Sequence, residues 1–204
     1  MKVIHLCGMS ACGKKTLLGH VWNMKGKSEE SFTESEQRLL YHLEIEGKYH
    51  IWGPFQCKGK YHADRGIEPT KRRFKTDIEN DECDTLIHHW QYETDGVFHF
   101  VHENHPDVTQ KTFLLWMQPS LHVEKIKERL EDAKANNDSR RIGMYSGRDE
   151  GSLRRSFTDL YNRLMRPELE GVNIDLNVIE NIGTEEHPVL RTIPSEELEG
   201  LFDI

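Results

Sequence analysis

The sequence has no apolar run near the roughly 20 residues that a membrane-spanning helix needs. Its first apolar run, residues 3–7, is also far too short for the hydrophobic region of a secretory signal peptide. We therefore expect a protein without a membrane segment, located in the cytoplasm.

Cysteine is scarce, and the four cysteines contain no Cys-x-x-Cys spacing. One of them, Cys12, lies inside a glycine-containing loop rather than in a cysteine cluster. This distribution predicts neither a disulfide framework nor a zinc site, and it fits a reducing compartment.

Positive charge is in deficit, because 27 Lys and Arg residues face 35 Asp and Glu residues and leave a formal net charge of −8. Such a chain does not coat nucleic acid by bulk electrostatics, although a local basic site remains compatible with it. The guanine-recognition motif Asn-Lys-x-Asp is also missing, which argues against a GTPase switch. What is present, 204 residues of which 36% are hydrophobic and 30% charged, suits a single globular domain over residues 1–204.

The most informative stretch is a phosphate-binding loop at residues 8–16. The spacing Gly8-x-x-x-x-Gly13-Lys14 follows a short apolar run that suits a buried strand, and it precedes a segment that can open a helix. In such a loop glycines let backbone N–H groups turn toward a phosphate, and the lysine reaches the terminal phosphates. We therefore expect a nucleotide to bind the loop residues Gly8, Ser10, Ala11, Cys12, Gly13, Lys14, Lys15 and Thr16.

The hydroxyl of this loop is displaced by one position. The Ser or Thr that usually follows the lysine is replaced by Lys15, and the hydroxyl arrives at Thr16. At this point the chain resembles the nucleoside monophosphate kinase-like branch of the P-loop kinases, in which adenylate kinases also place their threonine second after the loop lysine. We assign Thr16, and not Lys15, as the candidate Mg²⁺ ligand, because an ammonium does not coordinate a divalent cation at neutral pH.

Strands alternate with helices along the rest of the sequence, which predicts an α/β fold with a mainly parallel sheet. We expect five strands, at residues 3–7, 49–55, 97–101, 112–117 and 173–180. Two expected helices begin at capping boxes: one runs from Thr33 and Glu36 to Gly47, and one from Thr76 and Glu79 to Gly96. The other expected helices run from residue 16 to about 25, from Ser120 to Ala133, from Leu153 to just before Pro167, and after Ser195.

A basic loop at residues 58–75 leaves the end of the second expected strand. Its cations, in an otherwise acidic chain, suit either a solvated surface or contact with an anionic substrate, and its position at a strand end favours the second. The candidate substrate-binding residues in it are Arg65, Lys71, Arg72 and Arg73.

Phosphoryl transfer also calls for a carboxylate near the attacking hydroxyl and for cations over the transferred group. Glu103, just beyond the expected strand 97–101, is the first carboxylate candidate, and an ordinary surface acid is its alternative. Asp77 is the second, although an acid in a first helical turn is explained by the helix dipole alone. A polar lid at residues 137–150 between two helices carries the candidate catalytic cations Arg140, Arg141 and Arg148.

The resemblance to P-loop nucleoside and nucleotide kinases extends over roughly residues 1–180, and only the phosphate loop is sharply specific. It implies a three-layer α/β/α fold with a short lid, MgATP as phosphoryl donor, and a nucleoside- or nucleotide-type acceptor. More distantly, the short lid and the basic loop resemble bacteriophage kinases that phosphorylate 5-hydroxymethyl pyrimidines within DNA. Two alternatives stay open at this stage: a nucleotide-binding switch or NTPase, and a non-catalytic interaction protein with a degenerate loop.

Overall fold

The computed structural model describes residues 1–24, 32–45, 49–52, 67–80, 83–89, 95–183 and 189–201. Its strands are β1 (Lys2–Cys7), β2 (Tyr49–Trp52), β3 (Thr85–His89), β4 (Thr109–Trp116), β5 (Leu176–Asn181) and β6 (Leu190–Thr192). Its helices are α1 (Lys14–Met24), α2 (Glu34–Leu43), α3 (Ile67–Glu79), α4 (Asp95–Asn104), α5 (Pro119–Ala135), α6 (Ser139–Tyr145), α7 (Glu150–Leu169) and α8 (Ser195–Leu201).

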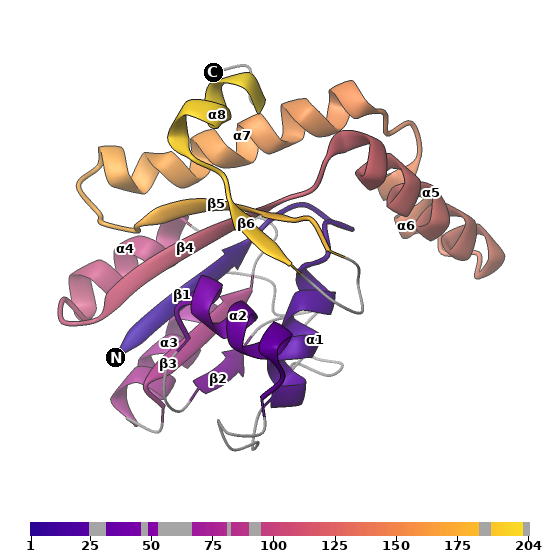
Figure 1. The fold of residues 1–204 in the computed structure, drawn as a ribbon. Coiled ribbons are helices and arrows are strands. Elements are labelled where there is room, and N and C mark those ends of the chain that lie inside the picture. Colours follow the sequence, from indigo (N-terminus) through magenta and orange to yellow (C-terminus); the bar gives the residue numbers. More distant parts are fainter. Residues whose placement is uncertain are drawn as a thin grey trace.

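The strands form one sheet in the order β2-β3-β1-β4-β5-β6 (Figure 1). The first five strands in this order are parallel, and β6 runs antiparallel to β5 at one edge. The α/β fold and the mainly parallel sheet are therefore confirmed, whereas the antiparallel sixth strand was not expected. Strand β1 lies inside the sheet, so the loop that follows it leaves the centre of the carboxyl edge.

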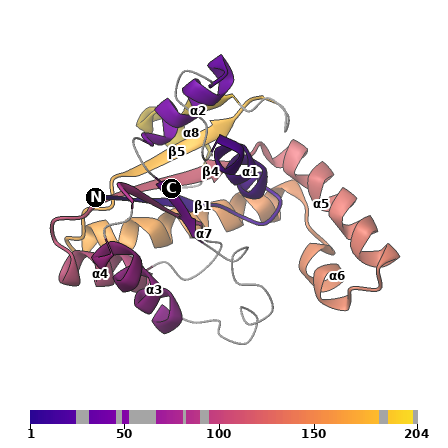
Figure 2. The ribbon, with the colours of Figure 1, turned by 90° about the horizontal axis from the view of Figure 1, so that it is seen from below.

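Helices cover both faces of the sheet, with α1, α2 and α8 on one face and α3, α4 and α7 on the other (Figures 1 and 2). Alternate residues of β1 serve the two faces, because Ile4 packs in one core cluster with Leu17 and Leu39 whereas Val3 packs in another with Phe74. Helices α5 and α6 extend beyond the sheet on the side of the loop after β1 (Figure 1). No helix within the described ranges is long and apolar enough to span a bilayer.

Polar side chains of β1, β3 and β4 are hydrogen-bonded to one another in the buried part of the sheet. The Nδ1 atoms of His5 and His88 are 3.2 Å apart, and Nε2 of His5 is 3.1 Å from Oε1 of Gln110. The amide nitrogen of Gln110 donates to the carbonyl of Phe98, so its oxygen faces His5 and must accept. His5 therefore carries its proton on Nε2, and His88 donates from Nδ1 to the bare Nδ1 of His5, with both rings neutral.

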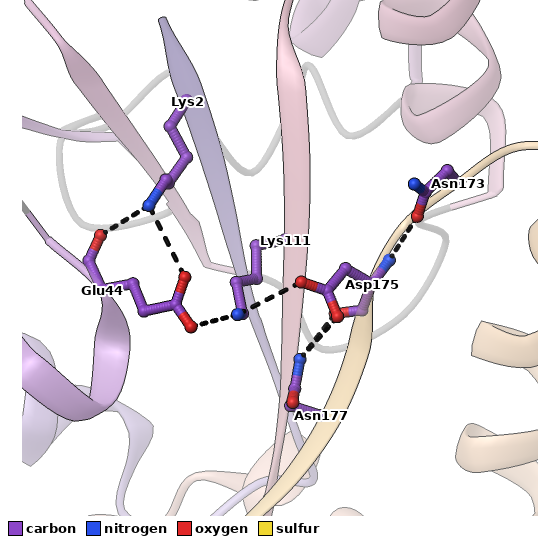
Figure 3. Close-up of polar contacts among 6 residues, drawn as sticks. All are labelled: Lys2, Glu44, Lys111, Asn173, Asp175 and Asn177. Atoms are coloured by element: carbon purple, nitrogen blue, oxygen red, sulfur yellow. Dashed lines mark hydrogen bonds and ion pairs between the residues drawn. The ribbon is translucent and has the colours of Figure 1, made fainter.

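A second polar network ties four elements together at the amino edge of the sheet (Figure 3). Lys111 of β4 pairs with Glu44 at the end of α2 and, at 3.1 Å, with Asp175 just before β5. Lys2 of β1 donates to the carbonyl of Glu44 at 3.0 Å. Asp175 accepts from Asn177 as well, at 2.8 Å on its carbonyl and 3.1 Å on its carboxylate. Because Glu44 and Asp175 both have positive φ, at 50° and 42°, the network holds two backbone turns that non-glycine residues rarely adopt.

Two predicted elements are wrong in type. The helix expected from residue 76 to 96 is instead the end of α3 followed by β3, in which all five residues are buried, as in a strand covered on both faces. The strand expected at 97–101 lies in α4, where Val97, Phe98 and Val101 form one buried helical face.

Other differences concern boundaries. Residues 67–75 of the expected basic loop are part of α3, and residues 58–66 lie outside the described residues. Helix α1 begins at Lys14 rather than Thr16, and α7 continues through Pro167 to Leu169. The capping box at Thr33 is confirmed, since Glu36 N–H donates to its hydroxyl at 3.2 Å, but α2 ends at the left-handed Glu44 before Gly47, which lies outside the described residues.

Candidate functional site

The loop between β1 and α1 has the backbone of a tight cradle. Gly8, Ala11 and Gly13 have φ values of 151°, 67° and 91°. A Cβ on Gly8 would lie 2.7 Å from Sγ of Cys12 and 3.0 Å from the carbonyl oxygen of Leu115, so only glycine fits there. The strand–loop–helix arrangement predicted for residues 8–16 is therefore confirmed as a structure.

Lys14, the first residue of α1, folds back over this loop. Its side chain is 6% exposed, and its ammonium donates to the carbonyls of Gly8 and Met9, each at 2.5 Å. It also lies 3.7 Å from Sγ of Cys12. Within the described part of the chain no carboxylate pairs with Lys14, so the loop carries a buried cation whose charge is matched only by carbonyl dipoles.

Helices α5 and α6 supply side chains that meet the loop at Ser10. The buried His122 of α5 donates from Nε2 to the Ser10 carbonyl at 2.7 Å, and the hydroxyl of Tyr145, the last residue of α6, is 3.1 Å from that of Ser10. Next to these contacts Ala11 packs with Tyr145 and Ile126 in a small apolar cluster. Sequence reasoning missed His122 and Tyr145, since no local motif surrounds either residue.

The electrostatic surroundings of His122 disfavour its protonation. Burial is the largest cause of the lowered pKa of His122, the hydrogen bond to Ser10 opposes it, and Lys14, Arg129 and Arg148 lower it further. Among the described residues Arg148 donates to neutral groups, the Met144 carbonyl at 3.4 Å and the Ser156 hydroxyl at 3.5 Å. Neither Arg129 nor Arg148 forms an ion pair with any residue that the structure describes.

Tyr145 responds to the same positive surroundings. Its burial raises the pKa of the phenol, but hydrogen bonds from Ser10, Arg129 and Arg141 outweigh burial and leave that pKa below its usual value. The phenol oxygen is thus an acceptor held among cations.

The expected lid arginines differ in their surroundings. Arg148 is half-buried and donates to the Met144 carbonyl and the Ser156 hydroxyl. Arg141 pairs with Asp132 of α5 at 2.9 Å, and Arg140 is exposed on α6. Residues 139–145 of the expected lid form α6, so much of this segment is helical rather than irregular.

The candidate Mg²⁺ ligand, Thr16, is the third residue of α1 and is half-buried. The side chain of Lys15 lies outside the described residues. The buried His89 lies at the end of β3, beside Leu6 of β1; burial, with a smaller effect from Lys14, lowers the pKa of His89 to about 3. The described donor set near the loop therefore offers a hydroxyl and a neutral imidazole.

The two candidate carboxylates lie at the opposite edge of the sheet. Glu103 is in the last turn of α4, shortly before β4, and Asp77 is in the last turn of α3, shortly before β3. Both strands begin in register with Lys2, the start of β1. The loop follows the other end of this six-residue strand, about 17 Å away. The structure therefore does not bring Glu103 or Asp77 to Lys14, because the expected strand that placed Glu103 near the loop is a helix.

Among the candidate substrate-binding cations, Lys71 and Arg72 line an open groove of about 500 Å³ between α3 and α4, together with Lys75, His99 and Glu103. Arg73 is exposed on the same helix, and Arg65 lies outside the described residues. The described part of the expected basic loop that carries Lys71, Arg72 and Arg73 is helical.

No protein-family model and no curated protein matches the sequence. Among solved structures, a chain from the PezAT chromosomal toxin–antitoxin system of Streptococcus pneumoniae is 13% identical, over 98% of this chain and 78% of that chain, with a TM-score of 0.52. The structure of APE1195 is 11% identical over 80% of this chain and 94% of that chain, with a TM-score of 0.44. At these identities the similarity to the PezAT chain is one of fold alone.

Proposed function

We propose that the chain is an ATP-dependent phosphotransferase, a P-loop kinase that moves the γ-phosphate of MgATP to a hydroxyl or phosphate of a nucleoside- or nucleotide-type acceptor. One observation carries the proposal: the buried Lys14 ammonium lies over the glycine loop after β1, donates to the Gly8 and Met9 carbonyls, and pairs with no carboxylate among the described residues. In a chain of net charge −8, such a buried cation calls for an anion.

The backbone of the loop supports the same ligand. Positive φ values at Gly8, Ala11 and Gly13 turn the backbone of the loop sharply at three points, and such turns occur in anion-binding concavities. Helix α1, 11 residues long, starts at Lys14 and adds the positive end of its dipole. The loop also leaves the carboxyl edge of a parallel sheet, where open α/β folds bind ligands. A three-layer α/β/α P-loop kinase domain over residues 1–204 is the finer fold that we propose.

The residues have distinct roles in this proposal. The Lys14 ammonium exchanges the Gly8 and Met9 carbonyls for phosphate oxygens and neutralises their charge. Arg129 and Arg148, which contribute to the positive surroundings of His122, are the further cations proposed to neutralise the phosphates, and the Thr16 hydroxyl is the candidate metal ligand. MgATP, when bound, supplies the phosphoryl group and the metal charge that stabilises its transfer. Arg140 and Arg141 have a weaker place here, since the first is exposed and the second is already paired.

The acceptor is the least constrained part of the proposal. The cations of α3 favour an acceptor with several phosphates, which keeps a 5-hydroxymethyl pyrimidine base in bacteriophage DNA as the finer suggestion. Such a substrate and a cytoplasmic location are both part of the proposal.

ATP turnover tests the proposal, measured with free nucleosides, with nucleoside monophosphates and with DNA that contains 5-hydroxymethyl pyrimidines. Lys14→Ala should lower the turnover number at least about 100-fold, because it removes the cation closest to the phosphates. Lys127→Ala, an exposed change on α5, is the matched control and should have no effect. Equal turnover in the folded Lys14→Ala variant would refute the proposal. Hydrolysis that no acceptor accelerates would favour an NTPase.

A further inference from the structure

The carbonyl and the hydroxyl of Ser10 both form hydrogen bonds with residues from outside the phosphate loop. Its carbonyl accepts from His122 Nε2 at 2.7 Å, and its hydroxyl is 3.1 Å from the hydroxyl of Tyr145. These partners are 112 and 135 positions away in the sequence. We call Ser10, His122 and Tyr145 the loop latch.

The His122 contact determines how one peptide group of the loop is turned. A trans peptide directs its C=O and its N–H to opposite sides. With the Ser10 carbonyl bound to His122, the N–H of Ala11 must point away from α5. Ala11 has a φ of 67°, a left-handed conformation that is unfavourable for a residue with a Cβ and needs support from its surroundings. That support is visible, because the Ala11 methyl group packs with Ile126, Tyr145 and Leu153.

The latch requires a neutral imidazole. Since a carbonyl can only accept, the proton of His122 is on Nε2. Its Nδ1 is buried and has no hydrogen-bond partner among the described residues. A second proton there would place a positive charge beside Lys14, Arg129 and Arg148, which agrees with the lowered pKa of His122. A neutral donor therefore orients the loop without competing for the anion that the cations attract.

Tyr145 adds the second contact from a fixed position. The residue is 5% exposed and is packed in the same apolar cluster as Ala11. Its hydroxyl therefore joins Ser10 to a cluster of residues from α5, α6 and α7.

We infer that the loop latch holds the phosphate loop in its anion-binding shape, so that His122 and Tyr145 are positioning residues that act through Ser10. One part of the inference, that the latch tightens MgATP binding, rests on the proposed function. The other part, that the loop loosens when the latch is removed, is independent of the proposed function.

The test compares substitutions that keep or remove the donor. His122→Gln can place an amide N–H near the position of Nε2, whereas His122→Leu cannot. MgATP binding, measured by calorimetry, should weaken about tenfold in His122→Leu and stay within about threefold in His122→Gln, as expected when a buried carbonyl loses its donor. Hydrogen exchange of the amides of residues 9–14 in the nucleotide-free protein should speed up in His122→Leu alone.

A double-mutant cycle covers the case in which His122→Leu does not fold. Ser10→Ala and Tyr145→Phe should each weaken MgATP binding about threefold, and the double variant should be no weaker than the single ones, because both remove the same contact. Tyr161→Phe, which removes a hydroxyl from α7 outside the latch, is the control.

The outcomes separate the two proposals. If Lys14→Ala loses MgATP binding while the latch variants bind like wild type, the latch is overturned and the kinase proposal stands. If the wild-type protein does not bind MgATP, the kinase proposal fails, and loop exchange decides the latch: unchanged exchange in the folded latch variants overturns it.

Discussion

The buried pair of His5 and His88 makes the stability of the fold depend on pH. Burial lowers the pKa of His5 to about 3, with the Gln110 hydrogen bond opposing it, and burial lowers the pKa of His88 well below its usual value. In the unfolded chain both titrate near 6.5. Between these values the unfolded state binds more protons than the folded state, so stability rises with pH. The contribution is fully present above pH 6.5 and is lost as the pH falls below it.

The size of the effect follows from the number of protons. Each histidine that is neutral when folded and charged when unfolded contributes about 1.4 kcal/mol per pH unit. Two units below 6.5, the pair alone has cost about 5 kcal/mol, which is the lower end of typical domain stability. The buried His89 and His122, whose pKa values are also lowered, add to the same slope. We therefore expect unfolding at mildly acidic pH.

Urea denaturation, followed by tryptophan fluorescence at a series of pH values between 7.5 and about 4.5, measures this slope. The informative variant is His88→Asn, which keeps an N–H donor near the place of Nδ1 and cannot be protonated. It should be less stable at neutral pH, because the ring that packs on Phe74 is lost. Its slope should nevertheless be smaller than that of the wild type by about one proton, or about 1.4 kcal/mol per pH unit.

An exposed histidine provides the control, since His102→Asn should leave the slope unchanged. A wild-type slope below one proton in this range, or an unchanged slope in His88→Asn, would refute the assignment of a neutral buried pair.

Three further outcomes are expected. Lys111→Met should lower the free energy of unfolding by about 1–2 kcal/mol in urea titrations, since it leaves the partly exposed Glu44 and Asp175 without their shared cation, whereas Lys127→Met should not; equal losses would contradict this. Thr16→Ala should raise the Mg²⁺ concentration for half-maximal turnover and Thr16→Ser should not, and a larger effect of Lys15→Ala would reverse the assignment. If DNA is the acceptor, filter binding over a salt series should show a binding constant that falls steeply with salt concentration. The slope of its logarithm against the logarithm of the salt concentration should fall by two to three units, at roughly 0.7–0.9 per contact, when Lys71, Arg72 and Arg73 are together replaced by alanine. No binding at low salt would remove DNA as the acceptor.

Local sequence was sufficient where one chemical requirement dominates. The loop from Gly8 to Lys14 was predicted because only glycine satisfies its close contacts and only a long cation reaches over it. The helix that begins after Thr33 was predicted from a capping box whose two hydrogen bonds are both local.

Prediction failed where tertiary burial overrides local pattern. Residues 83–90 have apolar side chains at helical spacing, yet they include β3, because a strand buried on both faces has no alternation to reveal it. Residues 97–101 are rich in valine and phenylalanine, which favour strands, yet Val97 and Val101 form the buried face of α4. The same error placed Glu103 at the wrong edge of the sheet. His122 and Tyr145 were missed because only the tertiary fold brings α5 and α6 to Ser10.

The central place of β1 in the sheet has a consequence for how the protein is made. The strand is synthesised before both of its neighbours, and its contacts through His5 reach residues 83 and 105 positions later. Until β4 has left the ribosome, β1 lacks one of its two neighbouring strands, and part of its apolar surface stays exposed to solvent. Long separations of this kind slow folding and lengthen the time during which a nascent chain can aggregate. We therefore expect the nascent protein to depend most on chaperones during synthesis, until β4 has emerged and β1 can be enclosed between β3 and β4.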